Sequence, residues 1–314
     1  MIGVDALDTA LARIRVQGSM VGRSLVTAPW GLEMTVADPC MLAAVVRGEA
    51  WIGHGDDEPV HLPEGAVAVA CGGVPLHMGD HPETPPGVRI TDREDCYDVV
   101  TGENVAQRGR SGSRTWGDPD APGSVLLGSY RTDGEVYALL ERDLPPLLVV
   151  PPDPLVAPVL AAVATETQDE RPGSQVVVDR LMELLLFAAI RAWLSSPAAA
   201  VPSWATALAD PLVGPVLRAM HAAPERRWTV AGLAAEGAVS RAAFARRFRD
   251  LVGEPPLAHL TRWRMALAAD ALRSEPGLDL TAVAARVGYA DAFSFSTAFR
   301  RVRGTTPSAH RRSA

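Results

Sequence analysis

The sequence is short of several residue types, and each shortage excludes a class of protein. It has only three cysteines, Cys40, Cys71 and Cys96, too few and too irregularly spaced for a disulfide framework or a paired-cysteine metal site. No apolar run reaches the ~18 residues that a membrane helix needs, and the N-terminus lacks the apolar core of a signal peptide. We therefore expect a cytoplasmic protein that does not enter a membrane.

Lysine is missing altogether, so all 30 basic residues are arginine. The formal net charge of −7 argues by itself against a nucleic-acid partner, but the charge is unevenly distributed. Residues 210–314 contain 16 Arg and 9 Asp or Glu, a net charge of +7, whereas the rest of the chain contains 14 Arg and 28 acidic residues, a net charge of −14. The C-terminal third therefore has the electrostatic character of a polyanion-binding domain.

Within this basic third, residues 228–253 show two helical periods separated by a small-residue turn. The first helix is expected to end at Gly237, which can adopt the left-handed conformation found after a helix C-terminus. The second begins after Ser240 as its cap, and Phe244 and Phe248 recur at the spacing of one buried face. The pattern predicts a recognition helix whose outward residues are Ser240, Arg241, Ala242, Ala245, Arg246 and Arg249.

Residues 279–304 repeat this pattern. A short helix is expected to end at Gly288, Asp291 caps the next helix, and Phe295 and Phe299 face inward. The amphipathic stretch 256–274 lies between the copies and could hold them at a fixed separation. The outward residues of the second copy are Ser294, Ser296, Thr297, Arg300 and Arg301.

The segments SRAAFARRFRDLVGEPP, LTRWRMALAADAL and AARVGYADAFSFSTAFRRVRGTTPSAHRR resemble the DNA-binding domain of the AraC/XylS family, over about residues 210–312. The resemblance implies an all-α domain, residues 210–314, with two helix-turn-helix units that bind double-stranded DNA through the outward residues of both copies. A regulator of this family could act as an activator and contact RNA polymerase.

From about residue 24 to residue 148, short apolar runs are separated by Gly, Pro and Asp clusters, as in a β-sandwich or barrel. The stretch VVRGEAWIGHGDDEPVHLPEGAVAVACGGVPLH looks like the cupin-type sensor domain that often precedes an AraC/XylS domain. The resemblance implies a β-barrel sensor within residues 1–150. A metal-binding cupin has a paired His-x-His, and this chain has no His before His54, so we expect no metal and no cofactor. If the barrel binds a small molecule, the expected lining is Trp30, Trp51, His61 and His77.

Residues 151–200 form a third region, in which the pattern becomes helical after a proline cluster. Two helices are expected, at 155–170 and 176–195, and the second is apolar on most of its circumference. Such a helix packs on the β domain or on a second subunit, and the resemblance favours a homodimer contact, with Leu185 and Leu186 in it. Residues 196–203 are predicted to be a linker.

The predicted fold is α+β and multidomain: an N-terminal cupin-like β-barrel, a helical dimer element, and a C-terminal all-α domain with two helix-turn-helix units. The predicted function is a sequence-specific transcription regulator, not an enzyme, that responds to a small molecule or another signal. Two alternatives stay open, a redox sensor that uses Cys40, Cys71 or Cys96 and a metal-binding cupin enzyme fused to a DNA-binding domain.

Overall fold

The structure is a computed structural model, which describes residues 15–16, 20–35, 40–55, 57–91, 95–130, 132–133, 144–168, 171–196 and 203–312. The chain divides into two compact units. Of the described residues, those within 15–132 and 144–196 belong to the sheet unit, and residues 203–312 belong to the helical unit. The spacing of Leu7, Leu11 and Ile14 predicts a helix over the first 18 residues, and this stretch lies outside the described residues apart from a two-residue strand, β1 (Arg15–Val16). None of the described helices is long and apolar enough to cross a membrane.

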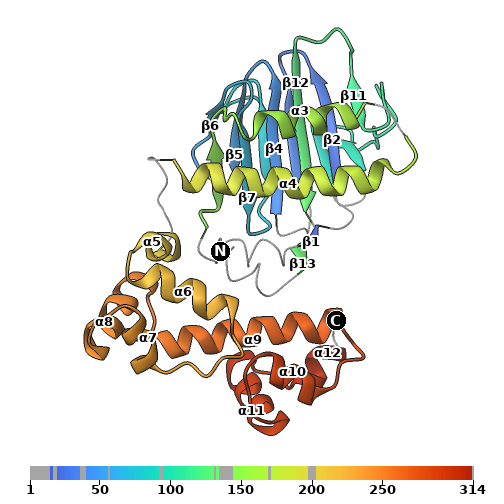
Figure 1. Ribbon diagram of the computed structural model, residues 1–314. Coiled ribbons are helices and arrows are strands. Elements are labelled where there is room, and N and C mark those ends of the chain that lie inside the picture. The colour runs from blue at the N-terminus through green and yellow to red at the C-terminus, as the bar shows by residue number, and fades with distance from the viewer. Residues whose placement is uncertain are drawn as a thin grey trace. The chain divides into compact units, whose positions relative to one another are not determined.

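Two six-stranded sheets make up most of the sheet unit (Figure 1). The first sheet has the spatial order β10-β9-β3-β8-β5-β6, and its strands are β3 (Gly31–Thr35), β5 (Ala50–His54), β6 (Val60–Leu62), β8 (Leu76–Gly79), β9 (Val88–Thr91) and β10 (Cys96–Asp98). The second sheet has the order β11-β2-β12-β4-β7-β14, and its strands are β2 (Met20–Val26), β4 (Cys40–Arg47), β7 (Val67–Cys71), β11 (Thr115–Gly117), β12 (Gly123–Tyr130) and β14 (Leu147–Val150). A third ladder joins β1 to β13 (Thr132–Asp133).

The expectation of a closed β-barrel is wrong for the described strands, because no ladder between them joins the two six-stranded sheets. The edge strands β6, β10 and β11 are only three residues long, so they offer few hydrogen bonds for closure. Short strands separated by Gly and Pro clusters are equally compatible with a sandwich, and the sequence pattern could not separate the two architectures.

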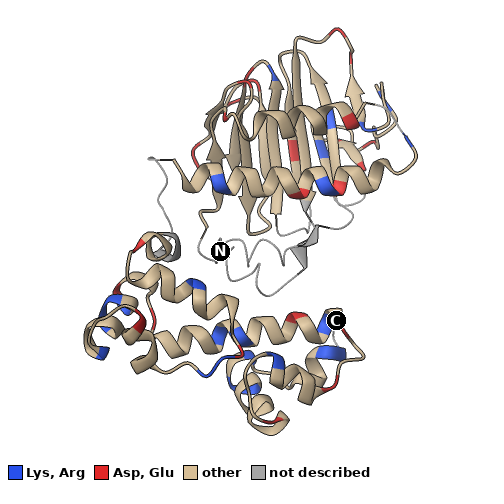
Figure 2. Cartoon of the chain, in the orientation of Figure 1, with Lys and Arg blue, Asp and Glu red and all other residues tan. Residues whose placement is uncertain are grey.

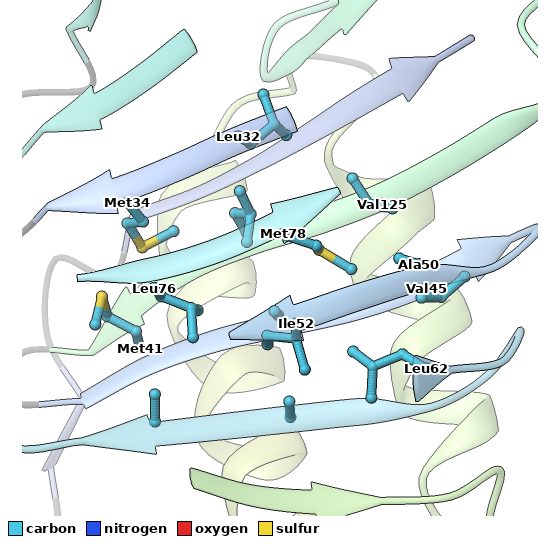
Figure 3. Packing of buried hydrophobic residues seen from close by; sticks show 14 of the residues in the cluster. Leu32, Met34, Met41, Val45, Ala50, Ile52, Leu62, Leu76, Met78 and Val125 are labelled. Carbon is cyan, nitrogen blue, oxygen red and sulfur yellow. The ribbon is translucent and has the colours of Figure 1, made fainter. Parts of the chain in front are cut away.

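The sandwich core lies between the two sheets and contains side chains from both (Figure 3). Met34 and Ile52 of the first sheet and Val45 of the second are fully buried there. Their neighbours in the second sheet are buried too: Leu42, Val69 and Leu126 point to the other face and are at most 1% exposed. Both faces of the second sheet are therefore covered there, which explains why β4, β7 and β14 are continuous apolar runs rather than alternating ones.

Two helices, α3 (Ala157–Glu166) and α4 (Ser174–Leu194), contact the outer face of the second sheet (Figure 1). Leu185 and Leu186 are 0% exposed within a single chain. The expectation that these two leucines lie between subunits is therefore wrong, because they pack inside their own sheet unit. The apolar side chains of α4 that remain exposed are Val176, Val177 and Leu184, at 65, 45 and 51%.

The helical unit contains eight helices within residues 203–312, namely α5 (Ser203–Ala209), α6 (Val213–Ala222), α7 (Val230–Glu236), α8 (Arg241–Val252), α9 (Pro256–Ser274), α10 (Leu280–Arg286), α11 (Ala292–Arg303) and α12 (Pro307–Arg312). The long central helix α9 has the bounds that the sequence predicted. Its Leu260 belongs to a core formed with α5–α8, and its Trp263 and Leu272 belong to a second core formed with α10 and α11. At ~1.5 Å per residue, α9 is about 28 Å long and joins the two cores.

Candidate DNA-binding interface

Helices α7 and α8 form the first predicted helix pair. The hydroxyl of Ser240 accepts a hydrogen bond from the Ala243 amide at 3.2 Å, so Ser240 caps α8 as predicted. The conformation expected for Gly237 is wrong, because its φ is −96° and the left-handed residue is Ala238, at φ 51°. A side chain is excluded at Gly237 for a different reason: a Cβ there would lie 2.0 Å from Leu212 Cδ1.

The exposed side of α8 carries most of the predicted contact residues. Phe244 and Phe248 are 0% exposed and anchor the helix in its core, with their ring centroids 5.7 Å apart. Arg241, Ala242, Arg246 and Arg249 are exposed, and Ala245 is half-buried. The sequence pattern therefore identified the outward face of this helix.

One arginine of α8 has a structural role instead. Arg247 Nε donates to Asp210 Oδ2 at 2.9 Å, and Asp210 also accepts hydrogen bonds from the amides of Leu212 and Val213 at the start of α6. The Arg247 guanidinium, with help from these amides, holds the pKa of Asp210 below its usual range, although burial acts in the opposite direction. Arg247 thus ties α8 to α6 and is not available to a ligand.

Helices α10 and α11 form the second predicted helix pair. Gly288 between them has φ +77°, as expected, and a Cβ there would lie 2.6 Å from the Glu225 carbonyl oxygen. The Asp291 carboxylate accepts a hydrogen bond from the Ser294 amide at 2.7 Å and caps α11, as predicted. The Ser294 hydroxyl donates to the Asp291 carbonyl at 3.1 Å, so Ser294 is half-buried in the cap.

Sequence reasoning missed the most prominent residue of α11. Phe293, the second residue of the helix, is 84% exposed, whereas Phe295 and Phe299 are 0% exposed. Phe293, Thr297 and Arg300 follow the spacing i, i+4, i+7, so they share one face of the helix, with half-buried Ser296 beside them. The period that placed Phe295 and Phe299 inside could have identified Phe293 as outward.

The arginines on these two faces are free of acidic partners. Arg241, Arg246, Arg249, Arg300 and Arg301 form no ion pair with any residue that the structure describes, whereas Arg226, Arg262 and Arg286 are paired with Glu236, Glu254 and Glu275. Figure 2 marks arginine positions, together with some acidic ones, on helices at both ends of the helical unit. The unpaired cations are therefore available to an anionic partner such as a phosphate backbone.

The four residues predicted to line a sensor pocket are not all brought together. Trp51 and His77 line a recess of about 40 Å³, which is little more than the space of one water molecule. The His61 ring lies 5.2 Å from that of Trp51, but its Nε2 contacts Glu49 at 3.1 Å, outside the recess. Trp30 packs against the sandwich core.

The described residues include no group of three or more His, Cys, Asp or Glu side chains arranged to hold a metal ion. Two of the three cysteines are nevertheless neighbours: Cys40 on β4 lies opposite Cys71 on β7. The Cys71 amide donates to the Pro146 carbonyl, away from β4, so the two cysteines form a non-hydrogen-bonded pair, in which facing side chains approach most closely. Cys96, on β10, lies in the other sheet.

The fold and the helix pairs define a transcription regulator with a cupin-type N-terminal domain. A family model described as "Cupin" matches residues 5–195, and one described as "Helix-turn-helix domain" matches residues 233–313. A Streptomyces lividans protein named an AraC-like transcription regulator is 31% identical, over 98% of each chain. A Streptomyces antibioticus protein of the same name is 30% identical, over 98% of this chain and 99% of its own.

The DNA-binding domain of AdpA, solved in complex with a target DNA, is 33% identical over 33% of this chain and 92% of its own, with a TM-score of 0.32. The Cupin model matches more than half of the chain, and both Streptomyces relatives are similar over almost all of it. The chain belongs to the AraC-like family of transcription regulators. The predictions of a cupin-like sheet domain and a C-terminal helix-turn-helix domain are thereby confirmed.

Proposed function

We propose that the chain binds double-stranded DNA through two helix-turn-helix units, α7–α8 and α10–α11, and that a signal received by the sheet unit changes this binding. The observation that carries the proposal is the repeated arrangement itself. Each unit buries two phenylalanines of its second helix and exposes arginines without acidic partners on the opposite face. We take residues 1–150 as the sensor domain, 151–200 as a packing and dimer element, and 210–314 as the DNA-binding domain.

The first unit supplies a strong base-reading group. Arg246 is exposed one turn beyond Ala242 on α8, and a guanidinium there can donate two hydrogen bonds to a guanine edge in the major groove. Such a contact provides roughly 1–3 kcal/mol of discrimination against other bases. Ala242 and Ala245 offer only methyl contact, and Arg241 and Arg249 flank them as phosphate ligands.

The second unit contributes apolar and hydroxyl contacts. Ser296 and Thr297 tolerate several bases, because a hydroxyl can both donate and accept. Phe293 presents a ring near the N-terminal end of α11, where recognition helices contact base edges. Arg300 and Arg301 lie later on the helix and contact phosphates, which adds affinity without sequence preference.

Dimerisation is a separate part of the proposal. Val176, Val177 and Leu184 form the exposed apolar side of α4, the side away from the residues buried on the sheet. We propose that this side contacts a second copy of the chain and that the regulator acts in the cytoplasm as a homodimer, without enzymatic activity. An activating role would make RNA polymerase a further partner.

Binding-site selection with the full chain tests the assignment of the two units. Arg246→Ala should relax the base preference at one position of the selected site. Arg300→Ala should instead weaken binding to all sequences alike and lower the salt dependence by about one phosphate contact. An unchanged consensus for Arg246→Ala, or an altered one for Arg300→Ala, would contradict the assignment.

The facing cysteines support a second candidate, a redox signal. Non-hydrogen-bonded neighbours in antiparallel strands have Cα atoms about 4.5 Å apart, within the range that a disulfide spans. A two-electron oxidant such as diamide would accept the two thiol hydrogens as the sulfur–sulfur bond between Cys40 and Cys71 forms. Peptide mass spectrometry should then find this cross-link, and DNA affinity should change with it. A dithiol that survives excess diamide would eliminate the candidate.

A further inference from the structure

We infer that the sheet unit contains a binding site for a small neutral hydrophobic compound of about the size of one ring. The site is a cavity of about 200 Å³ at the side of the sandwich where β10 and β11 are the edge strands. Its wall comes from β2, β11 and β12 of one sheet and from β3, β9 and β10 of the other. Figure 1 shows β2, β11 and β12 side by side at this end.

The cavity continues the hydrophobic core of the sandwich. Met20, Val26, Leu32 and Leu127 belong both to the core cluster and to the cavity wall. The lining residues of β9 and β10, namely Val88, Ile90 and Cys96, are half-buried. Strands therefore supply most of the wall, and Val105 and Arg108 of the loop between β10 and β11 complete it. A wall made mostly of strands suits recognition of a ligand by shape.

A tryptophan forms the flat part of the wall. Trp116 donates its Nε1 hydrogen to the Ala106 carbonyl at 2.6 Å, so the polar atom of the ring is already satisfied. The ring lies against the backbone of Gly22, where an added Cβ would be only 3.1 Å from its Cζ3 atom. Glycine at position 22 thus leaves room for the ring, which offers its apolar surface to the cavity.

The polarity of the wall determines the chemical class of the ligand. Among the residues that the structure describes, its lining includes no carboxylate, and the charged residue in it, Arg108, is exposed. The remaining polar side chains are the Ser24 hydroxyl and the Cys96 thiol. A charged ligand would lose its hydration in such a site without adequate replacement, whereas a neutral ring with at most one hydroxyl would not.

The volume of the cavity determines the size of the ligand that it can hold. An apolar cavity of about 150 Å³ binds benzene. A cavity of about 200 Å³ therefore admits a substituted benzene or a saturated ring of similar size. That such a ligand is the signal for DNA binding rests on the proposed function, but its binding to the cavity does not.

Thiol protection tests the site in the full chain. Cys96 is half-buried in the cavity wall, whereas Cys40 and Cys71 are 0 and 6% exposed. The rate of Cys96 alkylation by iodoacetamide, measured by peptide mass spectrometry, should fall with toluene or phenol by the factor 1 + [L]/Kd. Benzoate at equal concentration should protect at least about tenfold less effectively, because its carboxylate must be desolvated.

Two matched substitutions locate the site. Val105→Trp fills the cavity and should abolish protection by toluene, whereas Val100→Trp, at a position 91% exposed and outside the wall, should leave it intact. If Val105→Trp does not fold, Ile90→Phe fills the same cavity from β9. The inference is overturned if toluene does not protect Cys96, if benzoate protects equally, or if both filling variants remain protected. DNA binding assayed in parallel separates the outcomes: a chain that binds toluene but no DNA contradicts the proposed function alone.

Discussion

Substitution of Phe293 tests the proposal that α11 contacts DNA. An exposed aromatic ring at the start of a recognition helix can contact the C5-methyl group of thymine in the major groove. Phe293→Ala removes the ring but keeps the helix, because Asp291 still provides the cap and the ring makes little contact within the chain. Stability should therefore change by no more than about 0.5 kcal/mol, the usual effect of a surface substitution.

The expected loss of binding free energy follows from the exposed fraction of the Phe293 side chain. Fully burying a phenylalanine side chain is worth roughly 1.5–3 kcal/mol. Since 84% of Phe293 is exposed in the free chain, DNA can cover most of it, and we expect Phe293→Ala to cost roughly 1–2 kcal/mol of binding free energy. That corresponds to about a five- to thirtyfold loss of affinity, of which one thymine methyl accounts for about fourfold, at ~0.8 kcal/mol.

The assay replaces single thymines of the selected site by uracil, which differs only in the missing methyl group. At one position the substitution should weaken binding of the parent chain about fourfold and leave binding of Phe293→Ala unchanged. Val302→Ala is the matched control, because Val302 is an exposed apolar residue nine positions along α11, on the opposite side of the helix. If every uracil substitution affects the parent and Phe293→Ala equally, Phe293 does not read a thymine methyl.

Two further predictions concern folding and assembly. Leu186→Glu places a charge in the fully buried layer between α4 and the sheet, and it should therefore unfold the sheet unit. Leu184→Glu should leave the sheet unit folded and reduce the molecular mass measured by light scattering from that of a dimer to that of a monomer. A Leu184→Glu variant that stays dimeric would exclude this side of α4 as the dimer contact. Burial, followed by the charge of His259, holds the pKa of His221 well below its ordinary value of 6.5. Below pH 6.5 the unfolded chain therefore binds a proton at this histidine that the folded chain does not. As the pH is lowered further, the free energy of unfolding should fall by up to about 1.4 kcal/mol per pH unit. Hydrogen exchange in α6 and α9 should accelerate between pH 7.5 and 5.5 in the parent and less so in His221→Gln; equal acceleration would contradict this role for His221.

The helical unit was largely predictable from the sequence, because its signals are local. Capping residues such as Ser240 and Asp291, and buried residues such as Phe244 and Phe295, fall within one or two turns of each other and follow the helical period. The left-handed conformation predicted for Gly237 was wrong, and the requirement for glycine there has a non-local cause. Leu212, 25 positions earlier, occupies the space that a side chain at Gly237 would need, and no local pattern reveals that contact.

The sheet unit was less predictable, because strand pairing joins residues that are far apart in the sequence. Cys40 and Cys71 became neighbours only through the register of β4 and β7. The predicted lining of the sensor pocket is only partly brought together for the same reason: Trp51 and His77 share a small recess in one sheet, whereas the larger cavity lies beside Trp116 of the other sheet. The burial of Leu185 and Leu186 likewise depends on which face of α4 meets the sheet.

We propose that both helix-turn-helix units enter the major groove of the same DNA. A methylation-interference and hydroxyl-radical footprint of the full chain on its selected site shows whether they do. We expect two interfered major-groove segments on one face of the DNA, with their centres one helical turn, ~34 Å, apart. Arg246→Ala should weaken only one segment and Phe293→Ala only the other. A single segment, or two segments that respond to both substitutions alike, would contradict binding by two units.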